Sequence, residues 1–243
     1  MYDAMIAETV TITGHDGDAI EAYSARPLTP GPVGGVVVIH HMPGYDDSTK
    51  EIARNFAFHG YNVIMPNLYW REAPGASSDD AAATARAQGG VPDDRLVGDV
   101  AGAMAYLKGL SNANGKVATI GYCSGGRQSF LAGVSLDLDA AVDCYGAFVA
   151  GPAREGTTMV PIVDKTPDLS CPLLGLFGND DQYPSPAHVD QLEEALKANG
   201  KNYEFHRYPD TGHSFFSVNR PAYRPESATD GWQQIFAFYG RYL

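Results

Sequence analysis

The segment at residues 117–126 restricts the possible fold more than any other part of this sequence. An apolar run at 117–120 leads into Gly121-Tyr122-Cys123-Ser124-Gly125, and apolar residues at helical spacing follow. A strand, a sharp turn and a helix in this order form a nucleophile elbow, whose apex residue carries the reactive side chain. Glycines two residues before and after the apex fit this turn, because a Cβ at either place would collide with the neighbouring strand or helix. The pattern predicts a reactive thiol at Cys123, which the N–H groups at the start of the helix would favour as thiolate.

A second interpretation of this segment is purely structural. Free cysteine is a small, often buried hydrophobe, so Cys123 could simply pack beside a flexible glycine-rich turn. A catalytic role requires a base and a carboxylate elsewhere in the chain.

Strand and helix patterns alternate along the rest of the chain. Period-two alternation at 8–13 and 19–25 predicts an antiparallel hairpin at a sheet edge. Ser48-Thr49-Lys50-Glu51 has the spacing of a capping box and predicts the start of a helix. Further strands are expected at 36–39, 62–65, 117–120, 140–142, 172–178 and 203–208. The alternation predicts an α/β protein with a mostly parallel, doubly wound sheet of about eight strands, flanked by about six helices.

Length and composition favour one domain. The chain has 243 residues, of which 44% are hydrophobic, which is enough for a single large core. Residues 69–94 differ from the remainder, because they combine prolines and paired glycines with an alanine-rich piece. We therefore expect a single domain over residues 1–243, with 69–94 forming a small, partly helical excursion over the end of the sheet that holds the active site.

Charge and cysteine content exclude several classes of protein. The formal net charge of −12 makes nucleic acid and anionic membrane surfaces poor partners. Residues 1–8 contain no Lys or Arg, and no apolar run approaches about 20 residues, so we expect neither a signal peptide nor a membrane span. The three cysteines form no C-x-x-C pair, which is typical of free thiols in a reducing compartment. The sequence therefore predicts a cytoplasmic protein.

Reactive side chains follow three of the expected strands. Cys123 follows the first, Asp180 and Asp181 follow the strand that ends at 178, and His213 follows the strand that ends at 208. Nucleophile, acid and histidine in this order is the chain order of α/β-hydrolases, and ligands of such sheets bind at the carboxyl ends of the strands. We predict Cys123 as nucleophile, His213 as base and Asp181 as the carboxylate that orients the base. Asp180 is the alternative carboxylate, and Asp210 is expected to form a turn.

An oxyanion hole would need two backbone N–H groups near the thiol. The residue after the nucleophile, Ser124, is expected to supply one, and Met42 in the loop after the strand at 36–39 the other. The neighbouring pair His40-His41 raises the possibility of a metal. No Cys, Asp or Glu follows at ligand spacing, so no metal site is predicted.

Four stretches of the chain resemble the dienelactone hydrolase (carboxymethylenebutenolidase) family. Residues 121–126 resemble its cysteine elbow, and residues 66–75, Pro-Asn-Leu-Tyr-Trp-Arg-Glu-Ala-Pro-Gly, resemble its Pro-Asp-Leu-Tyr segment. Tyr145-Gly146 and the run at 212–215 also match. The resemblance implies an α/β-hydrolase fold and a cofactor-independent cysteine hydrolase that acts on small esters or unsaturated lactones. It assigns the triad to Cys123, Asp181 and His213.

The resemblance also suggests residues that contact substrate, and two departures from the family pattern. It implies that Arg71 grips a substrate carboxylate. An aromatic group, Tyr69, Trp70, Tyr145, Phe215 and Phe216, is able to line such a site, although aromatic residues at strand ends are more often core residues. His41, which we expect to contact substrate, stands where the dienelactone enzymes carry a glutamate that helps to deprotonate the thiol. Ser217 stands where they carry a second arginine, so a carboxylate would be held less tightly and a larger or neutral ester becomes a candidate substrate.

Two other classes of function are compatible with these residues. Cys123 could serve a thiol-based redox or electrophile-responsive protein without turnover, although no resolving cysteine lies nearby in sequence. The chain could also be a non-catalytic binding module on a hydrolase scaffold, which an intact triad argues against. A monomer and a homodimer are equally compatible with the sequence.

Overall fold

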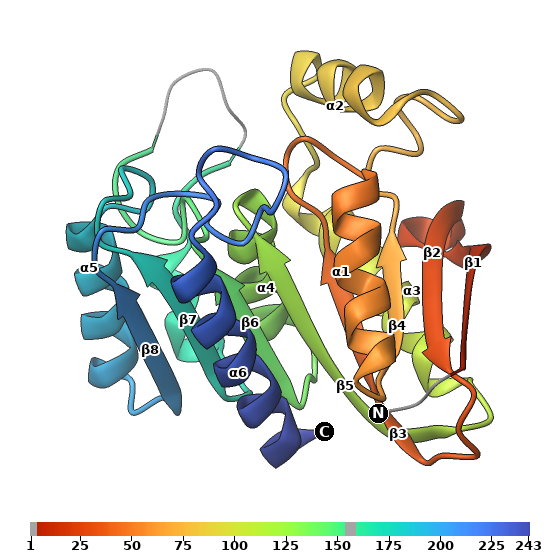
Figure 1. Ribbon diagram of the computed structural model, residues 1–243. Helices are drawn as coiled ribbons and strands as arrows, with labels where there is room; N and C mark the ends of the chain where they lie inside the picture. The colour runs from red at the N-terminus through yellow and green to blue at the C-terminus, as the bar shows by residue number, and fades with distance from the viewer. Residues whose placement is uncertain (1–3, 154–158) are drawn as a thin grey trace.

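A computed structural model describes residues 4–153 and 159–243, and a single sheet runs through its centre (Figure 1). The strand order is β1-β2-β4-β3-β5-β6-β7-β8. β1 pairs antiparallel with β2, and β2 with β4, whereas all other neighbours are parallel. The strands are β1 (Met5–Thr13), β2 (Ala19–Pro27), β3 (Val33–Ile39), β4 (Asn62–Pro66), β5 (Ala113–Tyr122), β6 (Ala140–Cys144), β7 (Leu173–Gly178) and β8 (Tyr203–Tyr208). The predicted mostly parallel, eight-stranded α/β sheet with a hairpin at one edge is confirmed.

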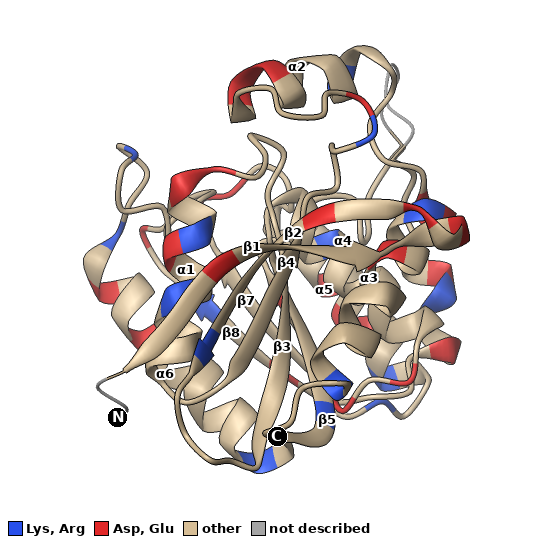
Figure 2. Cartoon of the chain, turned by 90° about the vertical axis from the view of Figure 1, so that its right-hand side faces the viewer, with Lys and Arg blue, Asp and Glu red and all other residues tan. Residues whose placement is uncertain are grey.

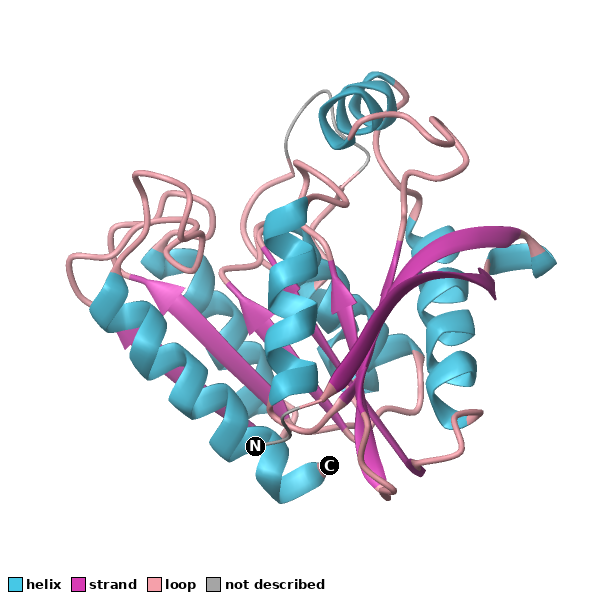
Figure 3. Ribbon diagram, turned by 45° about the vertical axis from the view of Figure 1, so that its right-hand side comes forward, coloured by secondary structure: helices cyan, strands magenta, loops and turns pink. Residues whose placement is uncertain are grey.

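Helices cover both faces of this sheet (Figures 1 and 3). α1 and α6 pack on one face, and α3, α4 and α5 pack on the other, whereas α2 lies beyond the carboxyl ends of the strands. The helices are α1 (Asp47–Phe58), α2 (Ser78–Ala87), α3 (Asp93–Lys108), α4 (Ser124–Ser135), α5 (Pro186–Ala198) and α6 (Pro225–Tyr242), with short 3₁₀ turns at His15–Gly17 and Val163–Asp168. None of the helices in the described part of the chain is long and apolar enough to cross a bilayer.

Strand β3 shows why the sheet is stable. Val37 and Ile39 belong to the apolar cluster beneath α3 and α4, whereas Val36 and Val38 belong to the cluster beneath α1 and α6. All four side chains are completely buried. Burial of one such side chain contributes about 1.5–3 kcal/mol, so a continuous β-branched run is stable only where helices cover both faces.

The start of α1 differs from the prediction. Asp46, not Ser48, caps the helix: its Oδ1 accepts hydrogen bonds from the Thr49 N–H and the Thr49 hydroxyl, both at 2.8 Å. Asp46 is favoured over Ser48 as the cap because its second oxygen, Oδ2, also contacts Nε2 of His41 at 2.7 Å. The cap therefore connects α1 to the loop after β3, where one side of the candidate site begins.

The alanine-rich piece of residues 69–94 forms α2, as expected. Ser77 caps it by accepting a hydrogen bond from the Asp80 N–H, and Asp79 and Asp80 occupy its first turn, where the helix dipole favours negative charge (Figure 2). Its buried side chains are all alanines, at 81, 82 and 85. Small side chains allow the helix to lie close to the loops at the carboxyl ends of the strands.

Candidate active site

Cys123 occupies the turn between β5 and α4. Its φ of 57° and ψ of −122° place it in a strained conformation that side-chain-bearing residues rarely adopt. A Cβ on Gly121 would lie 1.8 Å from the carbonyl oxygen of Gly125, and one on Gly125 would lie 2.4 Å from that of Ile39. The two glycines are therefore required for α4 to approach β5 and β3 closely, which is the geometry expected of the elbow.

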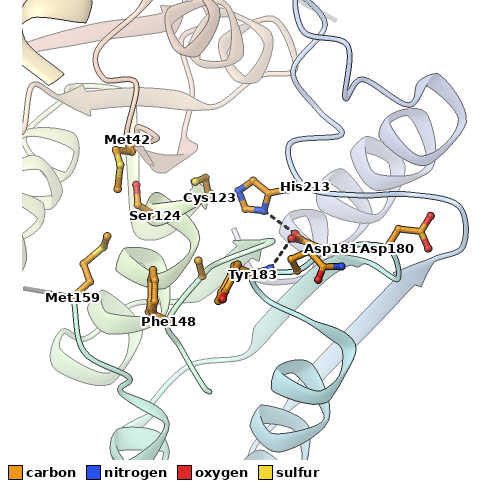
Figure 4. A pocket seen from close by; sticks show the side chains of 11 residues that line it. Met42, Cys123, Ser124, Phe148, Met159, Asp180, Asp181, Tyr183 and His213 are labelled. Carbon is orange, nitrogen blue, oxygen red and sulfur yellow. Dashed lines mark hydrogen bonds and ion pairs between the residues drawn. The ribbon is translucent and has the colours of Figure 1, made fainter. Parts of the chain in front are cut away.

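Asp181 and His213 lie in the loops that follow β7 and β8. The Asp181 Oδ2 atom lies 2.7 Å from Nδ1 of His213, and its Oδ1 atom accepts the Tyr183 N–H at 2.8 Å. Asp181 is 3% exposed, whereas the Asp180 side chain is exposed and points away from His213 (Figure 4). The carboxylate that contacts the histidine is thus the one chosen from the sequence.

The surroundings of His213 favour its protonated form. Burial by itself would lower the pKa of the ring, but hydrogen bonds with Asp181 and with the Cys123 thiol outweigh burial and raise the pKa of His213 to about 10. The site therefore favours the imidazolium form of His213, which has the Asp181 carboxylate at Nδ1 and interacts with the Cys123 side chain.

A cavity of about 410 Å³ opens beside these three residues. Met42 and Ser124, the residues expected to form an oxyanion hole, line it together with Cys123. The other described lining residues are Ala147, Phe148, Met159, Asp180, Asp181, Gln182, Tyr183 and His213 (Figure 4). The sequence analysis did not identify Phe148 and Tyr183 as lining residues. Each lies in the loop after a parallel strand, which is where ligand-binding residues of such sheets are expected. No sequence signal marks Met159.

His40 and His41 have separate structural partners. His40 is 1% exposed, and its Nε2 atom accepts the Leu68 N–H at 3.2 Å, while burial lowers the pKa of the ring to about 4. The Nε2 atom of His41 contacts Asp46. His41 is not among the described residues that line the cavity, so the expectation that it contacts substrate is not supported by the geometry.

The structure also corrects the expectation that Tyr145 and Phe215 line the cavity. Tyr145 and Phe215 are 1% and 0% exposed. The Tyr145 ring packs edge-on against His213, with 5.0 Å between ring centroids, and Phe215 packs against Tyr145 at 5.1 Å. Both residues are core residues that hold the histidine in place, because the loop after β8 folds back over the carboxyl end of β6.

Arg71 does not reach the cavity, which corrects its predicted role in substrate binding. Its guanidinium donates two hydrogen bonds to Asp99, each of 2.9 Å, and one to Asp18 of 2.6 Å. Asp99 is completely buried in α3. A buried carboxylate needs a paired cation, so Arg71 stabilises the contact between the 69–94 segment, α3 and the hairpin.

Replacement of Arg71 by alanine is expected to lower the free energy of unfolding by about 3 kcal/mol, because Asp99 would remain buried without its cation. The ratio of kcat/KM for a carboxylate-bearing ester to that for a neutral ester should not change. Urea unfolding and paired ester assays measure the two quantities. Arg241→Ala is the control, since Arg241 pairs with Glu204 at the surface and should contribute less than about 1 kcal/mol. A selective loss of the anionic substrate would show that Arg71 binds it.

A second buried carboxylate lies beneath the elbow. Asp143, near the end of β6, is completely buried, and its Oδ1 atom accepts the Gly146 N–H at 2.7 Å. Its Oδ2 atom is buried without a hydrogen-bond partner in the described structure. Burial outweighs the Gly146 hydrogen bond and raises the pKa of Asp143 to about 7. The carboxyl is thus protonated in mildly acidic solution and ionises near neutral pH.

Asp143 should therefore make stability depend on pH. Between its ordinary pKa of 3.8 and about 7, only the folded state binds the proton, so rising pH destabilises the fold by up to about 1.4 kcal/mol per unit. We expect the free energy of unfolding of wild type, relative to Asp143→Asn, to fall from pH 4 to pH 7 and then level off. Urea titrations of both proteins across this range measure the difference. A constant difference would show that the carboxyl is already ionised at pH 4.

The fold and site together define an α/β-hydrolase with a cysteine at the elbow. The family model described as "Dienelactone hydrolase family" matches residues 20–243. A relative from Methylorubrum extorquens, provisionally named carboxymethylenebutenolidase, is 33% identical over 245 residues, which cover 99% of this chain and 82% of that protein. Carboxymethylenebutenolidase 1 of Cupriavidus pinatubonensis is 28% identical over 231 residues, or 93% of each chain. A crystal structure from Klebsiella pneumoniae, provisionally named dienelactone hydrolase, matches with a TM-score of 0.85 and 29% identity over 99% of this chain and 100% of that chain.

The chain belongs to the dienelactone hydrolase family. It is therefore a hydrolase of the carboxylic-ester class to which carboxymethylenebutenolidases belong.

Proposed function

We propose that this protein hydrolyses small carboxylic esters or lactones through a Cys123–His213–Asp181 triad and an acyl-enzyme intermediate. The observation that carries the proposal is the convergence of three strand-exit residues on one cavity. Asp181 contacts Nδ1 of His213 at 2.7 Å, and His213 lines the same cavity as Cys123 and interacts with it electrostatically. A nucleophile, a base and an orienting carboxylate in contact are the parts that acyl transfer requires.

The first half of the reaction forms a thioester. The Cys123 sulfur, whose proton is held by His213, attacks the ester carbonyl carbon, and the N–H groups of Met42 and Ser124 stabilise the negative charge that develops on the carbonyl oxygen. The tetrahedral intermediate collapses as the bond from carbon to the alcohol oxygen breaks. Protonated His213 donates its Nε2 proton to the leaving oxygen, which produces an alcohol, or a hydroxyl on the same acyl chain when the substrate is a lactone.

The second half restores the enzyme. Neutral His213 removes a proton from water, and the resulting hydroxide attacks the thioester carbon. The bond from carbon to sulfur breaks, the carboxylic acid product leaves, and His213 is again protonated beside the sulfur. Asp181 keeps Nδ1 of the ring protonated in both halves, so that Nε2 faces the reacting atoms.

The alternative of a redox protein lacks a suitable second thiol among the described residues. Cys144 is completely buried, and burial raises the pKa of its thiol well above the usual range. Cys171 is 5% exposed, and burial raises its pKa to about 12. Disulfide exchange needs thiolate character, so neither cysteine is suited to resolve an oxidised Cys123.

A panel of 4-nitrophenyl esters and small lactones tests the proposal with wild type and Cys123→Ala. We expect wild type to hydrolyse some of these substrates and the variant to lose turnover while keeping its fold. A quenched reaction should also yield a wild-type protein with the mass of one added acyl group. Equal turnover by the variant would refute a cysteine mechanism, and thiol oxidation without ester turnover would favour the redox alternative.

A further inference from the structure

The cavity beside Cys123 has two unlike sides (Figure 4). Asp181 and His213 occupy one side, with Asp180 farther out. The other side consists of Met42, Phe148, Met159 and Tyr183, which come from the connections that follow β3, β6 and β7. A substrate held at Cys123 would therefore have its reacting carbonyl next to the charged side and the remainder of the molecule against an apolar side.

Two aromatic residues give the apolar side a definite shape. The rings of Phe148 and Tyr183 stack with 6.3 Å between centroids and an angle of 28° between planes. Tyr183 is 50% exposed, which is unusual for a large hydrophobic residue of this chain. An exposed aromatic at the edge of an apolar cavity is suited to cover a flat or bulky ligand group, because aromatic pairs favour stacked and edge-to-face contacts.

The charges around the cavity disfavour anions. The described lining residues include Asp180 and Asp181 but no Lys or Arg. Arg71, the cation expected to bind a carboxylate, is paired with Asp99 and Asp18 instead. The formal net charge of −12 adds a long-range repulsion. Among the described lining residues the cationic group is His213, which Asp181 already pairs at 2.7 Å, so a substrate carboxylate would lose its hydration there without gaining an unpaired cation.

From these observations, we infer that the substrate is an uncharged ester or lactone with an aromatic or bulky apolar group, which binds against Met42, Phe148, Met159 and Tyr183. This inference rests on the proposed hydrolase function and specifies its substrate class. It differs from the carboxylate-binding mode that the family resemblance implied for Arg71.

A matched pair of substrates tests the charge preference. The acyl chains of the two esters have equal length. 4-Nitrophenyl 6-methylheptanoate ends in an isopropyl group, and mono-4-nitrophenyl adipate ends in a carboxylate of similar shape. We expect kcat/KM of wild type to be about tenfold or more higher for the neutral ester. Equal values, or a preference for the adipate, would overturn the inference.

Variants at Gln182 test whether the cavity itself sets this preference. Gln182 lines the cavity, and its side chain is exposed. Gln182→Lys should raise the adipate-to-methylheptanoate ratio severalfold, whereas Gln182→Met, of similar size but uncharged, should leave the ratio at the wild-type value. An unchanged ratio in Gln182→Lys would mean that the acyl chain binds elsewhere.

Phe148→Ala tests the aromatic contact separately. We expect it to lower kcat/KM for 4-nitrophenyl phenylacetate about tenfold relative to 4-nitrophenyl acetate, which has the same leaving group but an acyl group without an aromatic ring. Equal effects on both esters would refute a binding role for Phe148. If only the substrate class is wrong, wild type will still hydrolyse 4-nitrophenyl acetate and Cys123→Ala will not. If wild type shows no Cys123-dependent turnover of any ester, the hydrolase mechanism itself is refuted.

Discussion

Asp181→Asn is expected to lower kcat for ester hydrolysis by on the order of 10³–10⁴-fold. Both carboxylate oxygens of Asp181 accept from N–H donors, one from Nδ1 of His213 and one from the Tyr183 backbone. An asparagine has a single acceptor oxygen. If that oxygen stays with Tyr183, the amide donates to His213 and forces the tautomer that leaves Nε2 protonated. If the amide flips, its NH₂ group opposes the Tyr183 N–H, so neither orientation preserves the site.

A pH–rate profile makes this prediction specific to the histidine. Hydrogen bonding to Asp181 is a principal cause of the raised pKa of His213, so Asp181→Asn should shift the alkaline limb of the profile downward from about 10. Asp180→Asn is the matched control, because Asp180 is adjacent in sequence but exposed and directed away from His213. Near-normal activity of Asp181→Asn together with inactivity of Asp180→Asn would mean that the other carboxylate orients His213.

Gly121→Ala is expected to destabilise the protein by at least about 3 kcal/mol and to leave little folded enzyme. The new Cβ would lie 1.8 Å from the Gly125 carbonyl oxygen and 2.1 Å from the Gly125 carbonyl carbon. Both atoms belong to the backbone at the start of α4, so no side-chain rearrangement can relieve the overlap. Relief would require α4 to move away from β5, which would displace Cys123 from the turn.

Gly240→Ala provides the comparison. Gly240 is exposed in α6, and a Cβ there would have no described atom from beyond its own stretch of helix within 4 Å. The same substitution should there stabilise the protein by about 0.5–1 kcal/mol, because alanine loses less backbone entropy on folding. Thermal unfolding of the two variants measures both effects. A Gly121→Ala protein with wild-type stability would show that α4 does not pack as closely on β5 as described.

The sequence was most informative where function depends on local backbone geometry. The turn has no room for a Cβ at positions 121 and 125, so both positions must be glycine. The pattern of Gly121, Cys123 and Gly125 therefore identified the elbow without any knowledge of the residues packed around it. The carboxyl ends of parallel strands meet at one edge of a sheet, so the order of the strands was enough to group Cys123 with His213 and an aspartate. The choice between Asp180 and Asp181 followed from position alone, and the contact with His213 agrees with it.

The choice of partners for charged and aromatic side chains was decided only by the tertiary structure. Arg71 was assigned to the cavity from a family motif, but Asp18 and Asp99, which lie 53 and 28 residues away in sequence, hold it elsewhere. Tyr145 and Phe215 follow strands as expected of cavity residues, yet both are buried beside His213. Periodicity and turn chemistry describe the path of the chain over a few residues. Ion pairs and cavity walls instead depend on which distant segments the completed sheet brings together, as it does for Phe148, Met159 and Tyr183.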